Sequence, residues 1–276
     1  MTRRARLTPQ QAGLPDFGGR RRVSGLRREE VALIAGISVE YYTRLERGNA
    51  TGVSEQVLDG ISRALQLDDA EHAHLLDLVR SATASPRVAR RGAPAKAGQV
   101  SPGIRHMIDA MKDLAVVIQN GRGDVIAANT LGRALYAPLF EQPQGPNFGR
   151  FVFLDPRSHD FYRDWDTAAQ QTVALLRSEA GRAPHDRALS NLVGEFSTRS
   201  DTFRTLWASH NVREHRTGTK ALHHPIVGDL TLSYEGLQIT SAPGLLMLPY
   251  TAEPGSESQE KLQLLATWVA SAQADA

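Results

Sequence analysis

Apolar residues recur at every third or fourth position along much of the first 80 residues, which is the spacing of amphipathic helices. Ser38, Ser54 and the pair Asp68–Asp69 stand directly before such stretches, where their side chains can accept hydrogen bonds from the free amides of a first helical turn. Thr8–Gln11, with proline second, has the form of a capping box. The pattern therefore predicts a cluster of short helices. The apolar positions that define them are Val31, Ile34 and Ala35, then Val57, Ile61 and Leu65, then Leu75, Leu76 and Val79.

Beyond residue 99, helical spacing alternates with the two-residue period of strands. Leu114–Gln119 and Asp124–Asn129 are predicted strands, and Asn120–Gly123 between them has the composition of a hairpin turn. Strands on both sides of a helical block predict an α+β domain with an antiparallel sheet. The other predicted elements are helices at 101–111 and from about 148 to 210, strands at 221–227, 229–239 and 245–252, and a final helix at 258–270.

Thr83–Gly98 separates the two patterns. Val88 is its one large apolar residue, and the rest is mainly alanine, proline, glycine, serine and cationic residues, which cannot bury enough apolar surface to order the segment. A chain of 276 residues is long enough for about two domains. We expect a mainly α domain at 1–82, a linker at 83–98 and an α+β domain at 99–276.

Composition excludes several classes of protein. Hydrophobic residues make up 41% and charged residues 22%, which is the balance of a globular protein. Without cysteine there is no disulfide, cysteine-bound zinc, iron–sulfur cluster or cysteine nucleophile. The longest apolar stretches, Leu114–Ile118 and Leu245–Leu248, are far shorter than the ~20 residues that span a bilayer, and the N-terminus lacks the apolar core of a signal peptide. We expect a cytoplasmic protein with no membrane span.

The formal net charge of +2 conceals an uneven distribution. Residues 1–98 carry 16 basic and 11 acidic side chains, whereas residues 99–276 carry 16 and 19. Residues 1–28 alone carry eight arginines and one aspartate. Such a density attracts a polyanion or an acidic membrane surface, or it belongs to a solvated arm. The motif that follows it decides between these interpretations.

The stretch Leu26–Gly48 has the features of two helices joined by a tight turn. Ala32 is small enough for helices to cross closely, Gly36 permits a left-handed turn, and Ile37 can insert into the core. Ser38 can cap the second helix. Because these features occur together beside an arginine-rich arm, they favour a DNA-binding unit over an ordinary helical hairpin.

The second helix of this unit would bury Tyr42 and Leu45 and present its other face to a major groove, where its N-terminal half meets base edges. An arginine fork suits guanine, a carboxylate suits cytosine, and a valine side chain suits the methyl group of thymine. The outward residues are Val39, Glu40, Thr43, Arg44 and Arg47.

At these residues, which end in Arg-Leu-Glu-Arg-Gly at 44–48, the chain resembles the Cro/C1-type (XRE) helix-turn-helix regulators. The resemblance implies a five-helix DNA-binding domain. Arg28 stands where the wider family commonly has glutamine, so a phosphate contact is assigned to it rather than a base contact. The resemblance implies base contacts from Val39, Glu40, Thr43 and Arg44, and phosphate contacts from Arg28, Arg47 and the turn after Gly48.

The arginine-rich arm is expected to add contacts of its own. Arg20, Arg21 and Arg22 lie in a glycine-rich loop and should meet phosphates or the minor groove without sequence selectivity. The resemblance also implies a longer first helix than the seven residues before Thr8 allow. Either this helix is short or translation starts upstream of Met1.

The second domain carries a resemblance of its own, to the ligand-binding domain of MmyB-like actinobacterial regulators. That resemblance implies a PAS-like domain, with a five-stranded antiparallel sheet and helices over one face, whose cavity takes fatty-acid-like ligands in relatives. The segments that carry it are Asn147–Pro156, Phe203–Val212, Gly218–Lys220, His224–Glu235 and Tyr250–Gly255.

Aromatic and cationic residues give this domain candidate ligand contacts. An aromatic set at helical spacing is more often plain core, and any single cation is more often a surface charge. The aromatic candidates are Phe161, Trp165, Phe203, Trp207 and Tyr234, and the candidate cations for a ligand carboxylate are Arg204, His210, Arg213, Lys220 and His224. From these we select Trp165, Trp207, His210, His224 and Tyr234 as the predicted ligand-binding residues.

Metal binding and catalysis find little support in the sequence. His72 and His74 lie ~200° apart around a helix, and the adjacent His223 and His224 point to opposite faces of a strand. The chain has no G-x-S-x-G, P-loop or G-x-G-x-x-G pattern. We expect no catalytic residue, no metal and no cofactor, and therefore a protein that is not an enzyme.

Together these observations predict a transcription regulator. It would bind a double-stranded, pseudo-palindromic operator as a homodimer, with half-sites ~34 Å apart, and a fatty-acid-like ligand would alter its affinity for DNA. Two alternatives stay open. One is a ligand-independent DNA-binding protein whose C-terminal domain serves only for dimerisation, and the other is a small-molecule-binding enzyme.

Overall fold

The computed structural model describes residues 3–14, 23–68, 71–72, 74–76, 78–79, 100–209 and 217–274, with side chains up to Ser271. These residues form two compact units, one mainly from the N-terminal part of the chain and the other mainly from residue 100 onward. The predicted linker at 83–98 lies outside the described residues, so the boundaries of the predicted domains stay predictions. Each unit is described by itself.

The first unit contains η1 (Arg3–Arg6), α1 (Arg28–Ala35), α2 (Val39–Glu46) and α3 (Glu55–Ala64), and helical backbone recurs between residues 71 and 79. The hydroxyl of Ser38 accepts from the Tyr41 amide at 3.1 Å, and that of Ser54 accepts from the Val57 amide at 3.4 Å. Asp68 accepts from the Glu71 amide at 2.8 Å. The predicted helix starts are therefore confirmed at these three positions.

The predicted helix start at Thr8 is only partly correct. The two hydrogen bonds of a capping box form, because Thr8 N donates to Gln11 Oε1 at 2.9 Å and Gln11 N donates to Thr8 Oγ1 at 3.3 Å. The backbone that follows is a turn rather than an α-helix. Gly13 adopts a φ of 78°, a left-handed conformation that ends helical winding after one turn.

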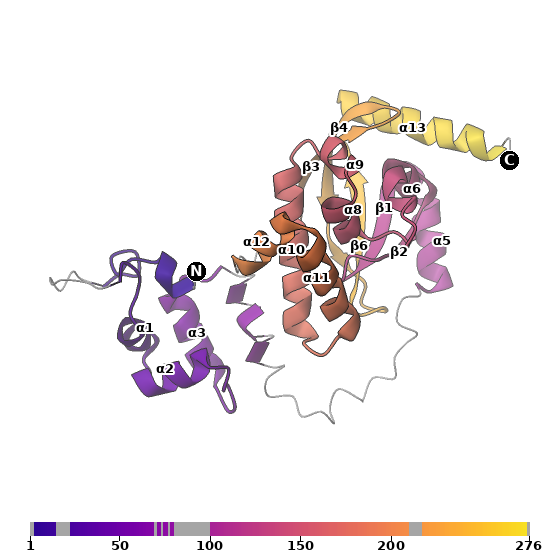
Figure 1. Ribbon diagram of the computed structural model, residues 1–276. Coiled ribbons are helices and arrows are strands. Elements are labelled where there is room, and N and C mark those ends of the chain that lie inside the picture. Colours follow the sequence, from indigo (N-terminus) through magenta and orange to yellow (C-terminus); the bar gives the residue numbers. More distant parts are fainter. Residues whose placement is uncertain are drawn as a thin grey trace. The chain divides into compact units, whose positions relative to one another are not determined.

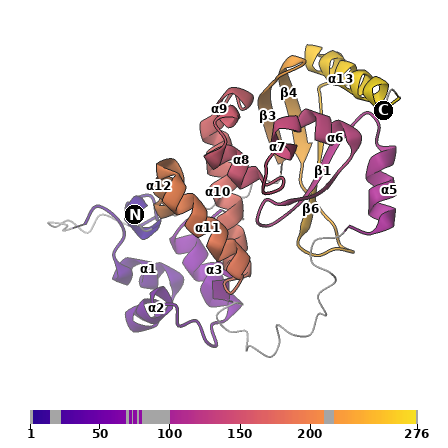
Figure 2. The same cartoon turned by 45° about the vertical axis from the view of Figure 1, so that its right-hand side comes forward.

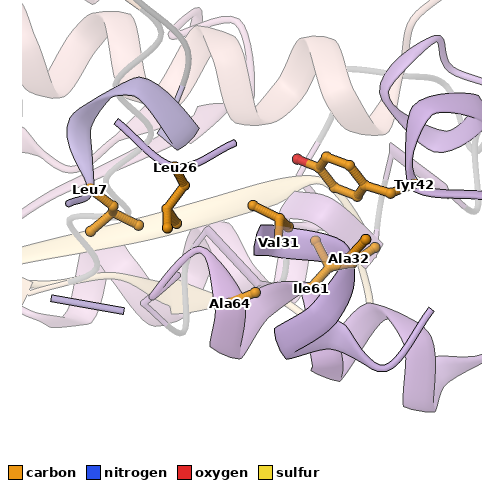
Figure 3. Close-up of a cluster of buried hydrophobic side chains, with 7 residues drawn as sticks. All are labelled: Leu7, Leu26, Val31, Ala32, Tyr42, Ile61 and Ala64. Carbon is orange, nitrogen blue, oxygen red and sulfur yellow. The ribbon is translucent and has the colours of Figure 1, made fainter. Parts of the chain in front are cut away.

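Seven buried side chains form the core of the first unit (Figure 3). Leu26 is fully buried and Ala32 is 1% exposed. Partly buried neighbours, including Ile37 and Leu45, pack against the cluster. The predicted inward faces of the first two helices are therefore confirmed. The cluster comprises Leu7, Leu26, Val31, Ala32, Tyr42, Ile61 and Ala64.

The second unit combines helices with a twisted antiparallel sheet (Figure 1). Its helices are α5 (Pro102–Ala110), α6 (Thr130–Leu135), α7 (Ala137–Phe140), α8 (Phe148–Leu154), α9 (Arg157–Phe161), α10 (Trp165–Arg182), α11 (Arg187–Arg199), α12 (Asp201–Ala208) and α13 (Glu257–Ala274). Its strands are β1 (Ala115–Asn120), β2 (Val125–Ala128), β3 (Thr217–His224), β4 (Gly228–Glu235), β5 (Leu237–Gln238) and β6 (Leu245–Thr251). The predicted α+β class, the β1–β2 hairpin and the central helical block are confirmed.

The strands follow the order β2-β1-β6-β4-β3, with β5 paired to β6 beside this path. The expected strand at 229–239 is interrupted at Gly236, and this interruption gives the sheet six strands instead of five. β4 and β5 nevertheless keep one register on β6, since Tyr234 pairs with Tyr250 and Leu237 with Met247. The last strand of the chain thus lies in the middle of the sheet, between the two hairpins.

Helices cover both faces of the sheet at β1, which corrects the expectation of helices over one face. Residues Ala115–Ile118 are buried at every position, so both faces of this strand need cover. Val116 and Ile118 pack with Ile108 of α5. On the other face, Tyr250 of β6 contacts Tyr136 beside α6. Figure 2 shows α5 and α8 on opposite sides of the sheet.

The sequence pattern does not predict the short helices α6 and α7, and it extends the second strand through Asn129. In the structure, Asn129 ends the hairpin and caps α6. Its Oδ1 accepts from the amides of Val116 and Gly132, and its Nδ2 faces three carbonyl oxygens. Gly132 lies so close to β1 that a Cβ there would be 2.3 Å from the Val116 carbonyl oxygen. One buried amide and one glycine thus dock α6 on the sheet.

Candidate functional site

The turn between α1 and α2 has the predicted geometry. Gly36 adopts a φ of 69°, and the amide of Ile37 donates to the carbonyl of Ala32 at 3.0 Å. The close helix crossing lies one turn further along α1, because a Cβ at Gly60 of α3 would be 2.7 Å from the carbonyl oxygen of Ala35. The left-handed glycine and the serine cap fix where α2 begins.

One face of α2 packs inward and the other is open. Tyr42 is 4% exposed and belongs to the core cluster, whereas Glu40, Arg44 and Arg47 are exposed. The open face forms a hollow of about 520 Å³. The structure thus brings together all four predicted base-contacting residues and two of the predicted phosphate contacts, which are Arg47 and, through Asn49, the turn after Gly48. The hollow is lined by Val39, Glu40, Thr43, Arg44, Arg47 and Asn49.

Two of these side chains are oriented by neighbours on the same helix. The guanidinium of Arg44 lies over the ring of Tyr41, with Cζ 4.6 Å from the ring centroid. The hydroxyl of Thr43 donates to the carbonyl of Val39 at 2.8 Å, which leaves its oxygen lone pairs and methyl group for a partner. Sequence reasoning assigned no role to Tyr41, although its position three residues before Arg44 is that of a helical neighbour.

The carboxylate of Glu46 joins α2 to α1 and to η1. Arg28 Nε donates to Glu46 Oε2 at 2.6 Å, and Arg4 Nε donates to Glu46 Oε1 at 3.1 Å. Burial by itself would raise the pKa of Glu46, but the hydrogen bonds and charges of the two arginines outweigh it and lower the pKa. Burial and the Glu46 carboxylate both raise the pKa of the Tyr42 phenol. The carboxylate therefore stays ionised and orients both arginines.

The predicted phosphate contacts differ in how far the structure describes them. Arg28 is 53% exposed while it binds Glu46, and Arg47 is exposed at the end of α2. Arg20, Arg21 and Arg22 lie outside the described residues. The predicted phosphate contacts that the structure describes thus lie at the start of α1 and directly after α2.

The predicted ligand-binding residues of the second unit fall into separate groups. Trp165 and Trp207 belong to one aromatic row, because Phe153 contacts Trp165 at 6.2 Å and Phe203 at 5.0 Å, and Phe203 stacks on Trp207 at 5.5 Å between ring centroids. Trp165 Nε1 donates to the Val152 carbonyl at 3.1 Å. Tyr234 lies in a different aromatic group, and His210 lies outside the described residues.

His224 has a protein partner at each ring nitrogen. Its Nδ1 accepts from the amides of Ile226 and Val227, at 3.2 and 3.4 Å, so its proton is on Nε2, which donates to the carbonyl of Ala134 at 3.0 Å. The side chain is 1% exposed, and burial lowers its pKa. This neutral histidine closes the β3–β4 turn and contacts α6. A ligand that bound to it would have to displace one of these partners.

Three further tyrosines gather around Tyr234 on the inner face of β3, β4 and β6. Tyr250 contacts Tyr136 at 5.4 Å and Tyr234 at 6.0 Å between ring centroids, and Tyr162 bridges to β3. Lys220 Nζ lies 5.5 Å from the ring centroids of both Tyr162 and Tyr234. We call Tyr136, Tyr162, Tyr234, Tyr250 and Lys220 the tyrosine–lysine cluster.

The four tyrosines of the cluster are withdrawn from water, whereas Lys220 is partly exposed. Each tyrosine in it is at most 4% exposed, and burial raises the pKa of all four phenols. Burial lowers the pKa of Lys220 to about 8. Sequence reasoning considered Lys220 as one of several scattered cations and missed three of the tyrosines, because strand pairing and the α9 turn bring them together from distant positions.

Other kinds of site have little support within the described part of the chain. No group of three or more histidine, aspartate or glutamate side chains there could hold a metal ion. None of the helices described is both long enough and apolar enough to cross a membrane.

Comparison with known families gives two matches. The model of the MmyB-like transcription regulator ligand binding domain matches residues 100–265, which is more than half of the chain. A helix-turn-helix domain model matches residues 3–75. No curated protein matches the chain. Both resemblances expected from the sequence are therefore confirmed at the level of these two domains.

Proposed function

The chain belongs to the family with the MmyB-like transcription regulator ligand binding domain, and from this premise we propose that it is a homodimeric regulator whose α2 binds operator DNA under the control of a small ligand. Its helix-turn-helix and ligand-binding domains are those of a DNA-binding transcription regulator. Our proposal adds which residues contact the operator, that the protein binds as a dimer, and what kind of molecule the ligand is.

The observation that carries the DNA-binding part is the hollow on α2. Val39, Glu40, Thr43 and Arg44 line it together, from the first turn to the last turn of a short capped helix whose other face is buried in the core. This is the arrangement in which a recognition helix presents its first turns to base edges. We assign base contacts to these four residues, and phosphate contacts to Arg28, Arg47 and the arm at Arg20–Arg22.

The regulatory part rests on the second unit. We propose that an apolar, fatty-acid-like molecule binds there and that its binding changes the affinity of the protein for the operator. Such a ligand must bind the DNA-competent and DNA-incompetent states unequally, because a ligand of equal affinity for both shifts no equilibrium. The proposal assigns the protein no catalytic activity and a place in the cytoplasm.

The first experiment selects operator sequences from a random duplex library and measures the affinity of the selected site by fluorescence anisotropy. Arg44→Ala should weaken binding by ~1–3 kcal/mol and relax the preference at one base position, because one bidentate contact to guanine is lost. Arg105→Ala, which removes an exposed arginine of α5, is the matched control and should leave both quantities unchanged. An Arg44→Ala protein with full affinity and preference would refute the assigned register of α2.

Footprinting on the selected operator tests the dimer. Two protected half-sites about one helical turn apart are expected, because one recognition helix covers only a few base pairs. A single unpaired half-site would refute the homodimer on DNA.

Native mass spectrometry of the purified full-length protein, followed by denaturing extraction, tests the ligand. A stoichiometric small molecule that changes operator affinity when added back supports the regulator. A protein that carries no ligand, and whose operator affinity no carboxylate or alcohol changes, would favour the alternative in which the second unit serves only for dimerisation.

A further inference from the structure

Lys220 occupies a position at which a charged residue is unexpected. It lies on β3 with its side chain on the same face as Leu222 and His224, which are 0% and 1% exposed, and it pairs in register with the fully buried Leu232 of β4. The neighbours on the opposite face of β3, Ala221 and His223, are exposed. Strand alternation therefore turns this lysine inward, toward the core of the ligand-binding unit.

No carboxylate neutralises this lysine within the residues that the structure describes. The groups recorded around its ammonium are the rings of Tyr162 and Tyr234, and burial is the one cause that lowers its pKa. Its side chain is partly exposed, and a charge that loses part of its water is destabilising unless an opposite charge or several hydrogen bonds compensate for it. Two aromatic faces attract a cation but neutralise none of its charge. An anionic group is therefore the kind of partner that suits this ammonium.

The tyrosines beside Lys220 provide further donors. The hydroxyl of Tyr136 is buried and makes no hydrogen bond among the described residues, although it lies near enough to the hydroxyl of Tyr250 for the two groups to shift each other's pKa. Burial holds all four phenols in the protonated form. Protonated phenols and an ammonium together donate hydrogen bonds to an oxyanion.

The shape of the cluster depends on a glycine. Gly218 pairs with Tyr234 across β3 and β4, and a Cβ at this position would lie 3.3 Å from the tyrosine ring and its hydroxyl oxygen. A larger residue would push the ring from its place beside Lys220. The lack of a side chain at Gly218 therefore leaves room for the Tyr234 ring and its hydroxyl at this position.

We propose that Lys220, with the hydroxyls of Tyr162 and Tyr234, binds the carboxylate of an amphipathic ligand inside the second unit. This inference rests on the proposed ligand-binding function. It places the polar contact of the ligand at Lys220, away from the aromatic row of Trp165 and Trp207. The inner face of the sheet around Lys220 is apolar, with Leu222 and Leu232 buried beside it. The ligand is thus an organic acid whose hydrocarbon part lies against these side chains.

The test compares acids and alcohols of equal chain length. Isothermal titration calorimetry on the full-length protein measures the affinity for straight-chain carboxylates from hexanoate to hexadecanoate, each against the corresponding alcohol. The wild type should prefer the carboxylate by about tenfold or more, which is the usual strength of a hydrogen bond to a charged group. Lys220→Met should abolish this preference and leave alcohol binding unchanged, whereas Lys220→Arg should keep it. Lys112→Met, at an exposed lysine of the same unit, is the matched control.

A second measurement uses the wild-type protein, so its result does not depend on whether a variant folds. Reductive methylation followed by mass spectrometry gives the labelling rate of each lysine. A saturating carboxylate should slow the labelling of Lys220 several-fold and leave Lys112 unaffected, and the alcohol should slow neither.

The outcomes separate the head-group site from the regulatory function. A carboxylate preference that survives Lys220→Met, an equal affinity for acid and alcohol, or no binding of any acid in the series would overturn the role of Lys220. A Lys220-dependent preference without any change in operator affinity would support the site and contradict ligand control of DNA binding.

Discussion

Arg28, the first residue of α1, donates through Nε to the carboxylate of Glu46, the last residue of α2, across 2.6 Å. Arg4 of η1 reaches the other oxygen of the same carboxylate. One acidic side chain thereby joins three segments around the face that we assign to DNA. Because Arg28 is half exposed in this pair, its guanidinium is oriented by Glu46 while it remains accessible.

Replacement of Glu46 by alanine should destabilise the first unit by about 1–3 kcal/mol, because two arginines lose a charged acceptor in a partly buried place. Circular dichroism during urea unfolding measures this loss. All three tryptophans lie in residues 100–276, so their fluorescence follows the second unit and should not change. Glu55→Ala, at an exposed residue in the first turn of α3, is the control and should lose about 0.5 kcal/mol. Equal losses in the two variants would contradict a special role for Glu46.

The same carboxylate predicts a pH dependence. The pKa of Glu46 is lower in the folded state than its ordinary value of 4.5, so the folded protein gains stability from this group above that pH. The contribution is lost as the pH falls through the folded-state pKa. Urea unfolding at neutral pH and at about pH 3 should therefore show a larger decrease in the first unit of the wild type than in Glu46→Gln. Parallel decreases would mean that another carboxylate causes the acid sensitivity.

Arg47 should behave differently from Arg44 in DNA binding. If Arg47 contacts a phosphate, Arg47→Ala weakens binding to all sequences alike and reduces the slope of log affinity against log salt by about 1. The base preferences of the operator should stay the same. Anisotropy titrations over a series of salt concentrations measure both quantities, and a change of preference at a single base would reassign Arg47 to base contact.

Tyr41 should contribute to the base contact through Arg44. Tyr41→Leu removes the ring over which the guanidinium lies, and we expect a several-fold loss of affinity at the base that Arg44 contacts, since a cation–π pair at an exposed site is worth about 0.5–1 kcal/mol. Tyr41→Phe keeps the ring and should bind like the wild type. A combined variant of Tyr41→Leu and Arg44→Ala should be no weaker than Arg44→Ala alone, and additive losses would show that Tyr41 acts independently.

Local signals in the sequence predict local structure well in this chain. Ser38, Ser54 and Ser101 each precede a helix, and each accepts from an amide three residues later, because a cap depends only on its own turn. The same holds for the left-handed Gly36 and for the β1–β2 hairpin. The outward face of α2 could be predicted because one helical period determines which residues share it.

Features that depend on distant residues could not be predicted in this way. The helices α6 and α7 are too short to show a helical period, and the side-chain amide of Asn129, which caps α6, meets partners from α5 and β1. The charge of Lys220 by itself suggests an exposed position, but Lys220 lies on the face of β3 that also carries the buried Leu222 and His224. Strand alternation alone does not show which face of a strand is covered.

Asn129→Ala should destabilise the second unit by about 3 kcal/mol or more. The substitution leaves the amides of Val116 and Gly132 without their acceptor and removes one donor from three carbonyl groups, and each buried polar group left unpaired is worth about 1–3 kcal/mol. Tryptophan fluorescence during urea unfolding measures this loss. Asn191→Ala, at an exposed position of α11, should have almost no effect. A similarly small effect of Asn129→Ala would mean that water replaces the amide.

Lys220→Met should make the ligand-free protein more stable at neutral pH, by up to about 3 kcal/mol, because the wild type holds an unpaired charge in a partly buried position there. The pKa of Lys220 is about 8 in the folded state, below its ordinary value of 10.5, so the charge is most unfavourable below pH 8. The wild type regains stability relative to the variant as the pH rises from about 8 toward 10.5. Groups away from Lys220 titrate alike in both proteins, so the difference between the two unfolding free energies reports on the lysine and the phenols that it contacts.

A saturating carboxylate should reverse this order at neutral pH, because it stabilises the wild type through its new ion pair and stabilises Lys220→Met less. Tryptophan-monitored urea unfolding of both proteins, with and without decanoate, measures the reversal. A lysine that weakens the empty protein and strengthens the occupied one is explained by binding and not by folding. If Lys220→Met instead destabilises the ligand-free protein, the ammonium already has a partner within the chain, and the anionic head group is not needed.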